Sequence, residues 1–356
     1  MTECNAHGLL NTCSKQLKTM KLPCKANTPK KYLATMVLLS LIIMTYIITR
    51  NSGEWNSVVY AQSRTKHSHH ENTSMKLSAD IQSKIETLVL FIGYPRSGHT
   101  LIGSLLDAHP HVVIANELNI FERWTEWKNE EKTRENLLNK MYDNSYKQSV
   151  SHKGYRSTAK NRGRSYAVPN QWQGKYKDYI KVIGDKKGGK ATKFFSYKQK
   201  VAKEVLDTIN LPVKLIHMVR NPYDNVATMV FRYLKLGPTE SIALKEKINN
   251  TDALNMNLRL HLIAVRNNYE LIKRFGRSVF TLHSEDVIAH PTESLKKLCD
   301  FLEVSCSKKY FKDCESILYT STSKTREKLV WPSSQKNRIE QAIMTVPFLN
   351  KYTFES

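Results

Sequence analysis

This chain of 356 residues lacks several features of other protein classes, and these absences exclude certain kinds of site and fold. No Cys-x-x-Cys pair and no His/Cys cluster has zinc spacing, which excludes a structural zinc site of the usual kind. No internal repeat is present, which excludes a solenoid or a propeller. Acidic residues are few, with 32 Asp and Glu against 55 Lys and Arg, so the formal net charge is +23.

One run of residues, Tyr32–Thr49, lacks charge altogether and is almost entirely apolar. Its 18 residues are just long enough to span a membrane as a helix, and we predict a single transmembrane signal-anchor helix at 32–49. A buried core helix is the alternative. A cleavable signal peptide fits poorly, because 31 residues precede the run and no small-residue cleavage site follows it.

Charge sets the expected orientation of this helix. Residues 1–31 carry six lysines against the single acid Glu3, so the positive-inside rule predicts a cytosolic tail at 1–31 and a lumenal remainder. The short span favours the thin membranes of the early secretory pathway, and we expect a type II Golgi membrane protein. Glycosylation sequons at Asn72 and Asn249 would then be lumenal.

The lumenal part has three cysteines, Cys299, Cys306 and Cys314. An oxidising lumen allows one disulfide and leaves one thiol over. A Cys306–Cys314 bridge would close a short loop, and Cys299 fits a buried helix position. The pairing stays open at this point.

Residues 50–85 are polar with little periodicity and are interpreted as a lumenal stalk, whereas 86–356 has a globular pattern. Apolar runs predict buried parallel strands at Thr87–Gly93, Val213–Val219 and Ser278–Leu282, with a short strand at Val112–Ile114. Helical patterns cover Thr100–Ala108, Ile120–Met141, Gln199–Asn210, Asp224–Leu236, Asp252–Phe275 and Pro291–Leu302. This alternation predicts an α/β fold, a three-layer sandwich with a central parallel sheet.

The segment 142–190 is basic, aromatic and weakly periodic, and is interpreted as an insertion over the sheet on the acceptor side. Sixteen Lys or Arg lie between Ser145 and Lys203, against only Asp178 and Asp185 as acids. A lumenal domain does not meet nucleic acid, so an acidic glycan, an acidic peptide or a phosphorylated cofactor is the expected partner. A solvated basic surface is the alternative.

The most informative motif follows the first strand and runs from Gly93 to Thr100, Gly-Tyr-Pro-Arg-Ser-Gly-His-Thr. Its spacing is that of a phosphate-binding P-loop, G-x-x-x-x-G-K-[ST], with His99 in place of the lysine. A nucleotide hydrolase or kinase needs that lysine on its terminal phosphates. The loop therefore indicates a phosphate site without γ-phosphoryl chemistry, with Arg96 as the fixed positive charge.

A second candidate anion site follows the strand Val213–Val219. Arg220 comes directly after this strand, and Thr228 lies eight residues later inside the next helix. A guanidinium and a hydroxyl placed in this way can hold one phosphate between them. Two such elements at the ends of parallel strands suit a ligand with phosphates at both ends.

Together these motifs resemble the sulfotransferase family, which uses PAPS (3′-phosphoadenosine-5′-phosphosulfate). The stretch Leu105–Pro110 followed by Glu117 is similar to the membrane-bound Golgi-type branch, which includes tyrosylprotein sulfotransferases. The segments His283–Val287 and Ser321–Arg326, with Trp331, resemble later family elements. The resemblance covers roughly 86–352 and implies a P-loop NTPase-like sandwich.

The resemblance also implies roles for individual residues. Arg96 would stabilise the bridging and leaving oxygens, and Ser97, Gly98, His99 and Thr100 would hold the 5′-phosphate. The 3′-phosphate would be held by Arg220 and Thr228, with Arg326 as a further candidate. Glu117 would be the catalytic base if burial raises its pKa, with His99 as rival, and Lys186 would neutralise the transferring sulfonate. No metal is needed.

The acceptor is not fixed by the resemblance. A carbohydrate hydroxyl is the first hypothesis, because Trp124, Trp127 and Trp172 offer aromatic faces for sugars and the basic segment suits an acidic polymer. Protein tyrosine is the second hypothesis. A P-loop kinase or NTPase and a non-catalytic, membrane-anchored binder of acidic glycans are the competing functions.

Overall fold

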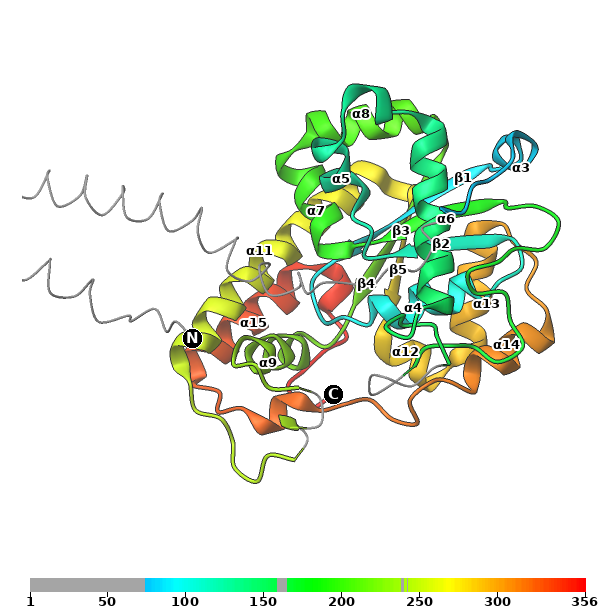
Figure 1. The fold of residues 1–356 in the computed structure, drawn as a ribbon. Coiled ribbons are helices and arrows are strands. Elements are labelled where there is room, and N and C mark those ends of the chain that lie inside the picture. Colours follow the sequence, from blue (N-terminus) through cyan, green and yellow to red (C-terminus); the bar gives the residue numbers. More distant parts are fainter. Residues whose placement is uncertain (1–73, 159–164, 238–239, 242) are drawn as a thin grey trace, which may run out of the picture. The chain divides into compact units, whose positions relative to one another are not determined.

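Five parallel strands form a sheet within the residues that the structure describes, which are 74–158, 165–237, 240–241 and 243–356 (Figure 1). The structure is a computed structural model. The strands are β1 (Thr87–Gly93), β2 (Val112–Asn116), β3 (Val182–Lys186), β4 (Val213–Val219) and β5 (Val279–His283). Their spatial order is β2-β3-β1-β4-β5, so the carboxyl end of β1 lies between those of β3 and β4.

Helices connect and extend the strands. In chain order they are α3 (Ala79–Ser83), α4 (His99–Asp107), α5 (Ile120–Glu126), α6 (Arg134–Val150), α7 (Gly188–Tyr197), α8 (Gln199–Ile209), α9 (Pro222–Tyr233), α11 (Thr251–Phe275), α12 (Ser284–Ala289), α13 (Pro291–Leu302), α14 (Lys308–Glu315) and α15 (Ser333–Thr345). Short 3-10 turns are η2 (Asn129–Glu131), η3 (Gly276–Ser278), η4 (Thr325–Lys328) and η5 (Pro347–Leu349).

Successive side chains of β1 bury against helices on opposite faces of the sheet. Leu88, Leu90 and Ile92 join an apolar cluster with residues of α5, α6, α7 and α8. Val89 and Phe91 join a second cluster with residues of α4, α13 and α14. Because neighbouring strand residues point to opposite faces, an unbroken aliphatic strand needs both layers. The predicted α/β fold with a central parallel sheet is confirmed.

The structure corrects two predicted elements. Strand β3 was not predicted, and it lies inside the segment 142–190, which is therefore partly built into the sheet and is not simply an insertion over it. The predicted helix Ile120–Met141 is broken into α5, η2 and α6, because Trp127 is extended and Thr133 begins α6 with a side-chain N-cap. By contrast, α13 has the predicted bounds.

The proposed boundary of the stalk also moves. Leu77, Ile81 and Ile85 are buried in the core, so residues within the predicted stalk 50–85 belong to the folded unit. The predicted transmembrane helix 32–49 lies outside the described residues. Within the described ranges, no helix is both long enough and apolar enough to cross a membrane.

The structure decides the cysteine pairing that the sequence left open. Cys299, on α13, forms a disulfide with Cys306, and Cys314 on α14 is a buried free thiol. The Cys306–Cys314 alternative is therefore wrong. The buried helix position expected for Cys299 is correct, and it is compatible with the bridge because Cys306 follows the end of α13 closely.

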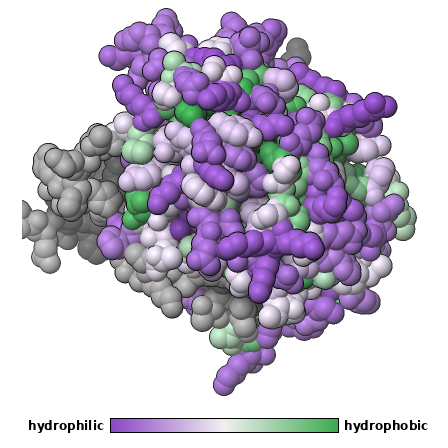
Figure 2. Space-filling view, turned by 90° about the vertical axis from the view of Figure 1, so that its right-hand side faces the viewer, coloured by the Kyte–Doolittle hydropathy of each residue, from purple (hydrophilic) through white to green (hydrophobic). Residues whose placement is uncertain are grey.

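The side of the molecule that carries α3, α13 and α14 is mostly hydrophilic, with apolar side chains scattered across it (Figure 2). Charges on α13 are paired locally, since Lys296 bonds Asp300 and Lys297 bonds Glu293 one turn away. Such exposed i,i+4 pairs contribute little to stability.

A buried ion pair joins α4 to the segment after α6. The Asp107 carboxylate lies 2.7 Å from Nη1 of Arg156, and both side chains are fully buried. Asp107 also accepts the N–H groups of Ile114 at 2.7 Å and Gly174 at 3.1 Å, and the Ser145 hydroxyl at 2.7 Å. One carboxylate therefore holds α4, β2, α6 and the basic segment together.

We predict that Asp107→Asn lowers the free energy of unfolding by about 3–5 kcal/mol, because it leaves the Arg156 charge buried without its partner. Asp300→Asn, which removes an exposed carboxylate on α13, is the matched control and should change stability by less than about 0.5 kcal/mol. Denaturant unfolding measures both. A loss below 1 kcal/mol for Asp107→Asn would contradict the role assigned to the pair.

Candidate active site

The loop after β1 has the backbone of a phosphate cradle. Gly93 has φ +139°, and a Cβ atom there would lie 2.9 Å from both His99 Nε2 and the Met218 carbonyl oxygen. Arg96 (φ +72°) and Gly98 (φ +89°) then turn the chain into the N-terminus of α4. The first N–H groups of a helix lack intrahelical partners, and together with the helix dipole they favour an anion.

His99 does not point into this cradle. Its buried ring donates from Nε2 to the Ile92 carbonyl at 3.1 Å, and its Nδ1 lies 3.2 Å from the Ser97 hydroxyl. Burial lowers the pKa of His99 to about 4, although the Ile92 carbonyl opposes the shift. The ring is neutral, and both of its nitrogens have hydrogen-bond partners beneath the loop. This geometry disfavours the hypothesis that His99 is a catalytic base.

Lys186 supplies a cation to the loop from the neighbouring strand. It ends β3, and its Nζ lies 3.0 Å from the Thr100 hydroxyl and 2.5 Å from Glu117 Oε1. Its stem packs on α4 at Gly103, where a Cβ atom would lie 3.1 Å from the lysine Cγ. Burial lowers the pKa of Lys186 to about 8, and Glu117 limits that shift.

Glu117 follows β2 and lies at the same edge of the sheet. Its side chain is 43% exposed, and its carboxylate contacts the ammonium groups of Lys186 and Lys187. Partial burial pushes the pKa of Glu117 upward, but the two lysines outweigh it and the net pKa is lowered. The condition named for a base at this position, a pKa of Glu117 raised by burial, is therefore not met in this arrangement. Glu117 is ionised in this arrangement and accepts protons only weakly.

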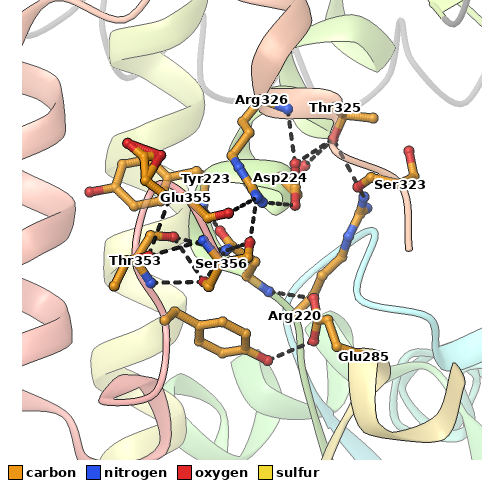
Figure 3. Close-up of polar contacts among 12 residues, drawn as sticks. Arg220, Tyr223, Asp224, Glu285, Ser323, Thr325, Arg326, Thr353, Glu355 and Ser356 are labelled. Atoms are coloured by element: carbon orange, nitrogen blue, oxygen red, sulfur yellow. Dashed lines mark hydrogen bonds and ion pairs between the residues drawn. The ribbon is translucent and has the colours of Figure 1, made fainter. Parts of the chain in front are cut away.

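The second anion element surrounds the Arg220 guanidinium with neutral oxygens (Figure 3). Nη1 bonds Thr228 Oγ1 at 3.1 Å, and Nη2 bonds the Ser323 carbonyl at 3.1 Å and Thr325 Oγ1 at 3.4 Å. Burial lowers the pKa of Arg220, while Asp224 and Glu285 act against that shift. Within the described ranges Arg220 makes no ion pair, so this half-buried cation suits an incoming anion.

Arg326 has a different role from the one predicted. Its guanidinium is buried, bonds Asp224 Oδ2 at 2.5 Å and donates to the carbonyl oxygens of Glu355 and Ser356 (Figure 3). The Asp224 carboxylate already neutralises the guanidinium charge that a phosphate would need. Arg326 therefore anchors η4 to α9 and the C-terminal segment, and we withdraw it as a phosphate-binding residue.

The two anion elements are adjacent. Arg220 Nη1 donates to the Arg96 carbonyl at 3.2 Å, and Asn225 Nδ2 on α9 donates to the Pro95 carbonyl at 3.0 Å. The loop, Thr100, Lys186 and Glu117 on one side and Arg220 with Thr228 on the other therefore line one continuous edge of the sheet.

Sequence reasoning missed three contributors to this edge. Thr325 is brought to Arg220 from a distant segment, Lys187 contacts Glu117, and Asp185 bonds the segment after Glu117. The Asp-Lys-Lys run at the end of β3 was the available signal for the last two. Of the suggested sugar-stacking residues, Trp124 is buried in the core and offers no free face, whereas Trp127 is partly buried and packs against that core.

The described residues contain no group of three or more His, Cys, Asp or Glu side chains that could hold a metal ion. No curated protein sequence matched the chain.

Three solved structures illustrate the structural likeness. The sulfotransferase domain of the Synechococcus PCC 7002 olefin synthase is 16% identical with a TM-score of 0.42, covering 80% of this chain and 99% of that one. Mouse sulfotransferase SULT7A1 complexed with PAP is 14% identical with a TM-score of 0.38, and the match covers 79% of this chain and 95% of that one. An Alicyclobacillus acidocaldarius sulfotransferase is 16% identical with a TM-score of 0.37, and the match covers 74% of this chain and 94% of that one.

These identities and scores are low, and the assignment depends on a family model instead. The model described as "Sulfotransferase family" matches residues 89–308, more than half of the chain, and contains the loop, Glu117, Lys186, Arg220 and Thr228. The chain belongs to the sulfotransferase family.

Proposed function

We propose that this protein transfers a sulfonate group from PAPS to a hydroxyl acceptor, most simply on an acidic glycan. The observation that carries the proposal is the unpaired Arg220 guanidinium directly beside the phosphate loop. A nucleotide with phosphates on both sides of its ribose bridges two such neighbouring sites. Membership of the sulfotransferase family supports the same substrate.

The residues at this edge fit such a nucleotide. The N–H groups from Ser97 to Thr100 and the Thr100 hydroxyl would hold the 5′-phosphate at the start of α4. Arg220, Thr228 and Thr325 would hold the 3′-phosphate, since all three donors meet at one point. PAPS supplies an activated sulfonate, whose transfer relies on positioning and on stabilising charge, as phosphoryl transfer does.

Three side chains then serve the chemistry. Lys186 neutralises charge on the transferring group, because its ammonium already touches the loop hydroxyl of Thr100. Glu117 accepts the proton of the acceptor hydroxyl as the new S–O bond forms. It is anionic in the free protein, and its proton affinity rises when Lys186 turns from it toward the sulfonate. Arg96 is exposed in the loop and would stabilise the developing charge on the leaving phosphate.

An acidic glycan is the acceptor that the charge distribution favours. Lys187 pairs with Glu117 and Lys190 pairs with Glu122, and both lysines lie within the stretch 145–203 that has sixteen cations and two acids. A sulfated or carboxylated polymer is attracted to such a surface. Protein tyrosine is the alternative acceptor, and the assay below includes it.

We further propose a type II Golgi membrane protein with its catalytic domain in the lumen. The uncharged run at 32–49 and the lysines that precede it support this orientation. The Cys299–Cys306 disulfide supports an oxidising compartment.

We predict that Arg220→Ala weakens binding of PAP, the desulfated nucleotide, at least tenfold, because it removes the charged donor to the 3′-phosphate. Arg232→Ala removes an exposed arginine near the end of α9, the helix that follows Arg220; it is the matched control and should leave the Kd within twofold. Isothermal titration of the full-length protein measures both.

The same preparation tests the function. PAPS turnover with partly desulfated heparin supports the glycan proposal, and turnover only with a tyrosine peptide supports the alternative. Heparin binding with no PAP affinity would instead favour a non-catalytic glycan binder. Magnesium-dependent ATP hydrolysis would favour an NTPase.

Titration of Lys186 predicts a basic limb in the pH profile. Its pKa is lowered to about 8, so the cation is lost as pH rises through that value and kcat/KM should fall about tenfold per pH unit above it. Lys186→Arg keeps its charge and should remove this limb, although its rate will be lower. An unchanged limb in that variant would assign it to another group.

A lumenal catalytic domain predicts a glycan on Asn249. Asn249 and Thr251 of the sequon are exposed at the start of α11. Full-length protein expressed in mammalian cells should shift in mass on N-glycosidase treatment, and Asn249→Gln should remove one glycan. Asn250→Gln is the control, since it keeps the sequon. A glycan on Asn72 would show that the protein has entered the lumen. If Asn249 carries no glycan in such protein, the site prediction is wrong.

A further inference from the structure

The end of β3 holds the segment that carries Glu117 by both its backbone and its side chains. The Glu117 N–H donates to the Lys186 carbonyl at 3.1 Å, and the Glu117 carboxylate contacts the ammonium groups of Lys186 and Lys187. The backbone of Glu117 is thus held by Lys186, the last residue of β3, and its side chain by Lys186 and by Lys187, which follows the strand.

Asp185 holds the rest of this segment. Its buried carboxylate accepts the N–H of Leu118 on Oδ1 at 3.2 Å and the N–H of Ile120 on Oδ2 at 3.0 Å. Successive side chains of a strand point to opposite faces. Asp185 therefore reaches the start of α5, while Lys186 reaches the phosphate loop and Thr100.

The segment needs such support. Glu117 and Asn119 both have φ +61°, a left-handed conformation that residues with side chains seldom adopt. Asn119 is the N-cap residue of α5, yet its side chain makes no capping hydrogen bond. The carboxylate from β3 takes over that capping role. Strained, over-determined backbone of this kind concentrates at functional sites.

We propose that Asp185 is a positioning residue for sulfonate transfer, which acts by fixing the segment 117–120 so that Glu117 faces Lys186. This inference rests on the proposed function. Because Asp185 and Lys186 are consecutive, one strand end sets the position of the base and of the cation relative to each other. A displacement of Glu117 by about 1 Å is enough to slow such chemistry greatly.

Asp185→Asn separates positioning from mere folding. An asparagine keeps one acceptor oxygen but turns an NH₂ group toward the second backbone N–H, so the segment 117–120 loosens. The charged or titratable groups that face Glu117 are Lys186 and Lys187, with Asp185 beside them and His99 from α4. If the Glu117 carboxylate moves away from Lys186 and Lys187, the two charges that lower its pKa are lost and the pKa of Glu117 rises.

The experiment uses the full-length protein with PAPS and partly desulfated heparin. Protonation of Glu117 would give kcat/KM an acidic limb. Asp185→Asn should lower kcat 10–100-fold, leave the Kd for PAP within threefold and shift this acidic limb to higher pH. In the Glu117→Gln background the same substitution should cost less than twofold, because residues that act through one another are not additive.

Asp143→Asn is the matched control. Asp143 is also a buried carboxylate that accepts a backbone N–H, from Met75 at 3.1 Å, but it lies on α6. It should change stability without moving the acidic limb or lowering kcat more than twofold.

Three results would overturn the proposal: an equal loss of kcat and of PAP affinity, an unmoved acidic limb, or full additivity with Glu117→Gln. If heparin is not an acceptor, the carboxyl ¹³C shift of labelled Glu117 gives the same decision. The pKa of Glu117 should rise in Asp185→Asn and stay in Asp143→Asn. A wild-type protein that neither binds PAP nor consumes PAPS would refute the proposed function alone.

Discussion

The contact of the Lys186 ammonium with Thr100 and Glu117 connects the parts of the candidate site that follow β1, β2 and β3. It joins β3 to the phosphate loop of β1 and to the segment after β2. Lys186 reaches this point because β3 lies between β1 and β2 in a parallel sheet, so the three carboxyl ends meet at one edge. Burial lowers the pKa of the Lys186 ammonium, and the neighbouring Glu117 carboxylate raises it again.

The same arrangement explains the histidine in the loop. A P-loop normally carries its cation at position 99, but here His99 turns inward and bonds the Ile92 carbonyl. A Cβ atom on Gly188 would lie 2.3 Å from its ring, so α7 begins with a glycine that allows this close approach. The loop thus keeps its backbone donors, while the neighbouring strand provides the charge.

Much of the fold could be predicted, because its signals are local. The aliphatic runs of β1 and β4 and the Pro291 start of α13 depend on neighbouring residues alone. Strand β3 was missed because five residues ending in Asp-Lys, within a basic stretch, carry little apolar pattern. Strand β3 is buried because β1 and β2 lie on either side of it, and both strands are distant from it in the sequence.

By itself, the sequence determined the phosphate loop, the eight-residue spacing of Arg220 and Thr228, and the alternation that produces a parallel sheet. Only the tertiary structure decided which charges are free. Arg326 is neutralised by Asp224, whereas Arg220, four residues from the same aspartate, meets neutral oxygens. The pKa of Glu117 is lowered rather than raised for the same reason. Electrostatic partners are set by distances in space, and residues remote in sequence supply them.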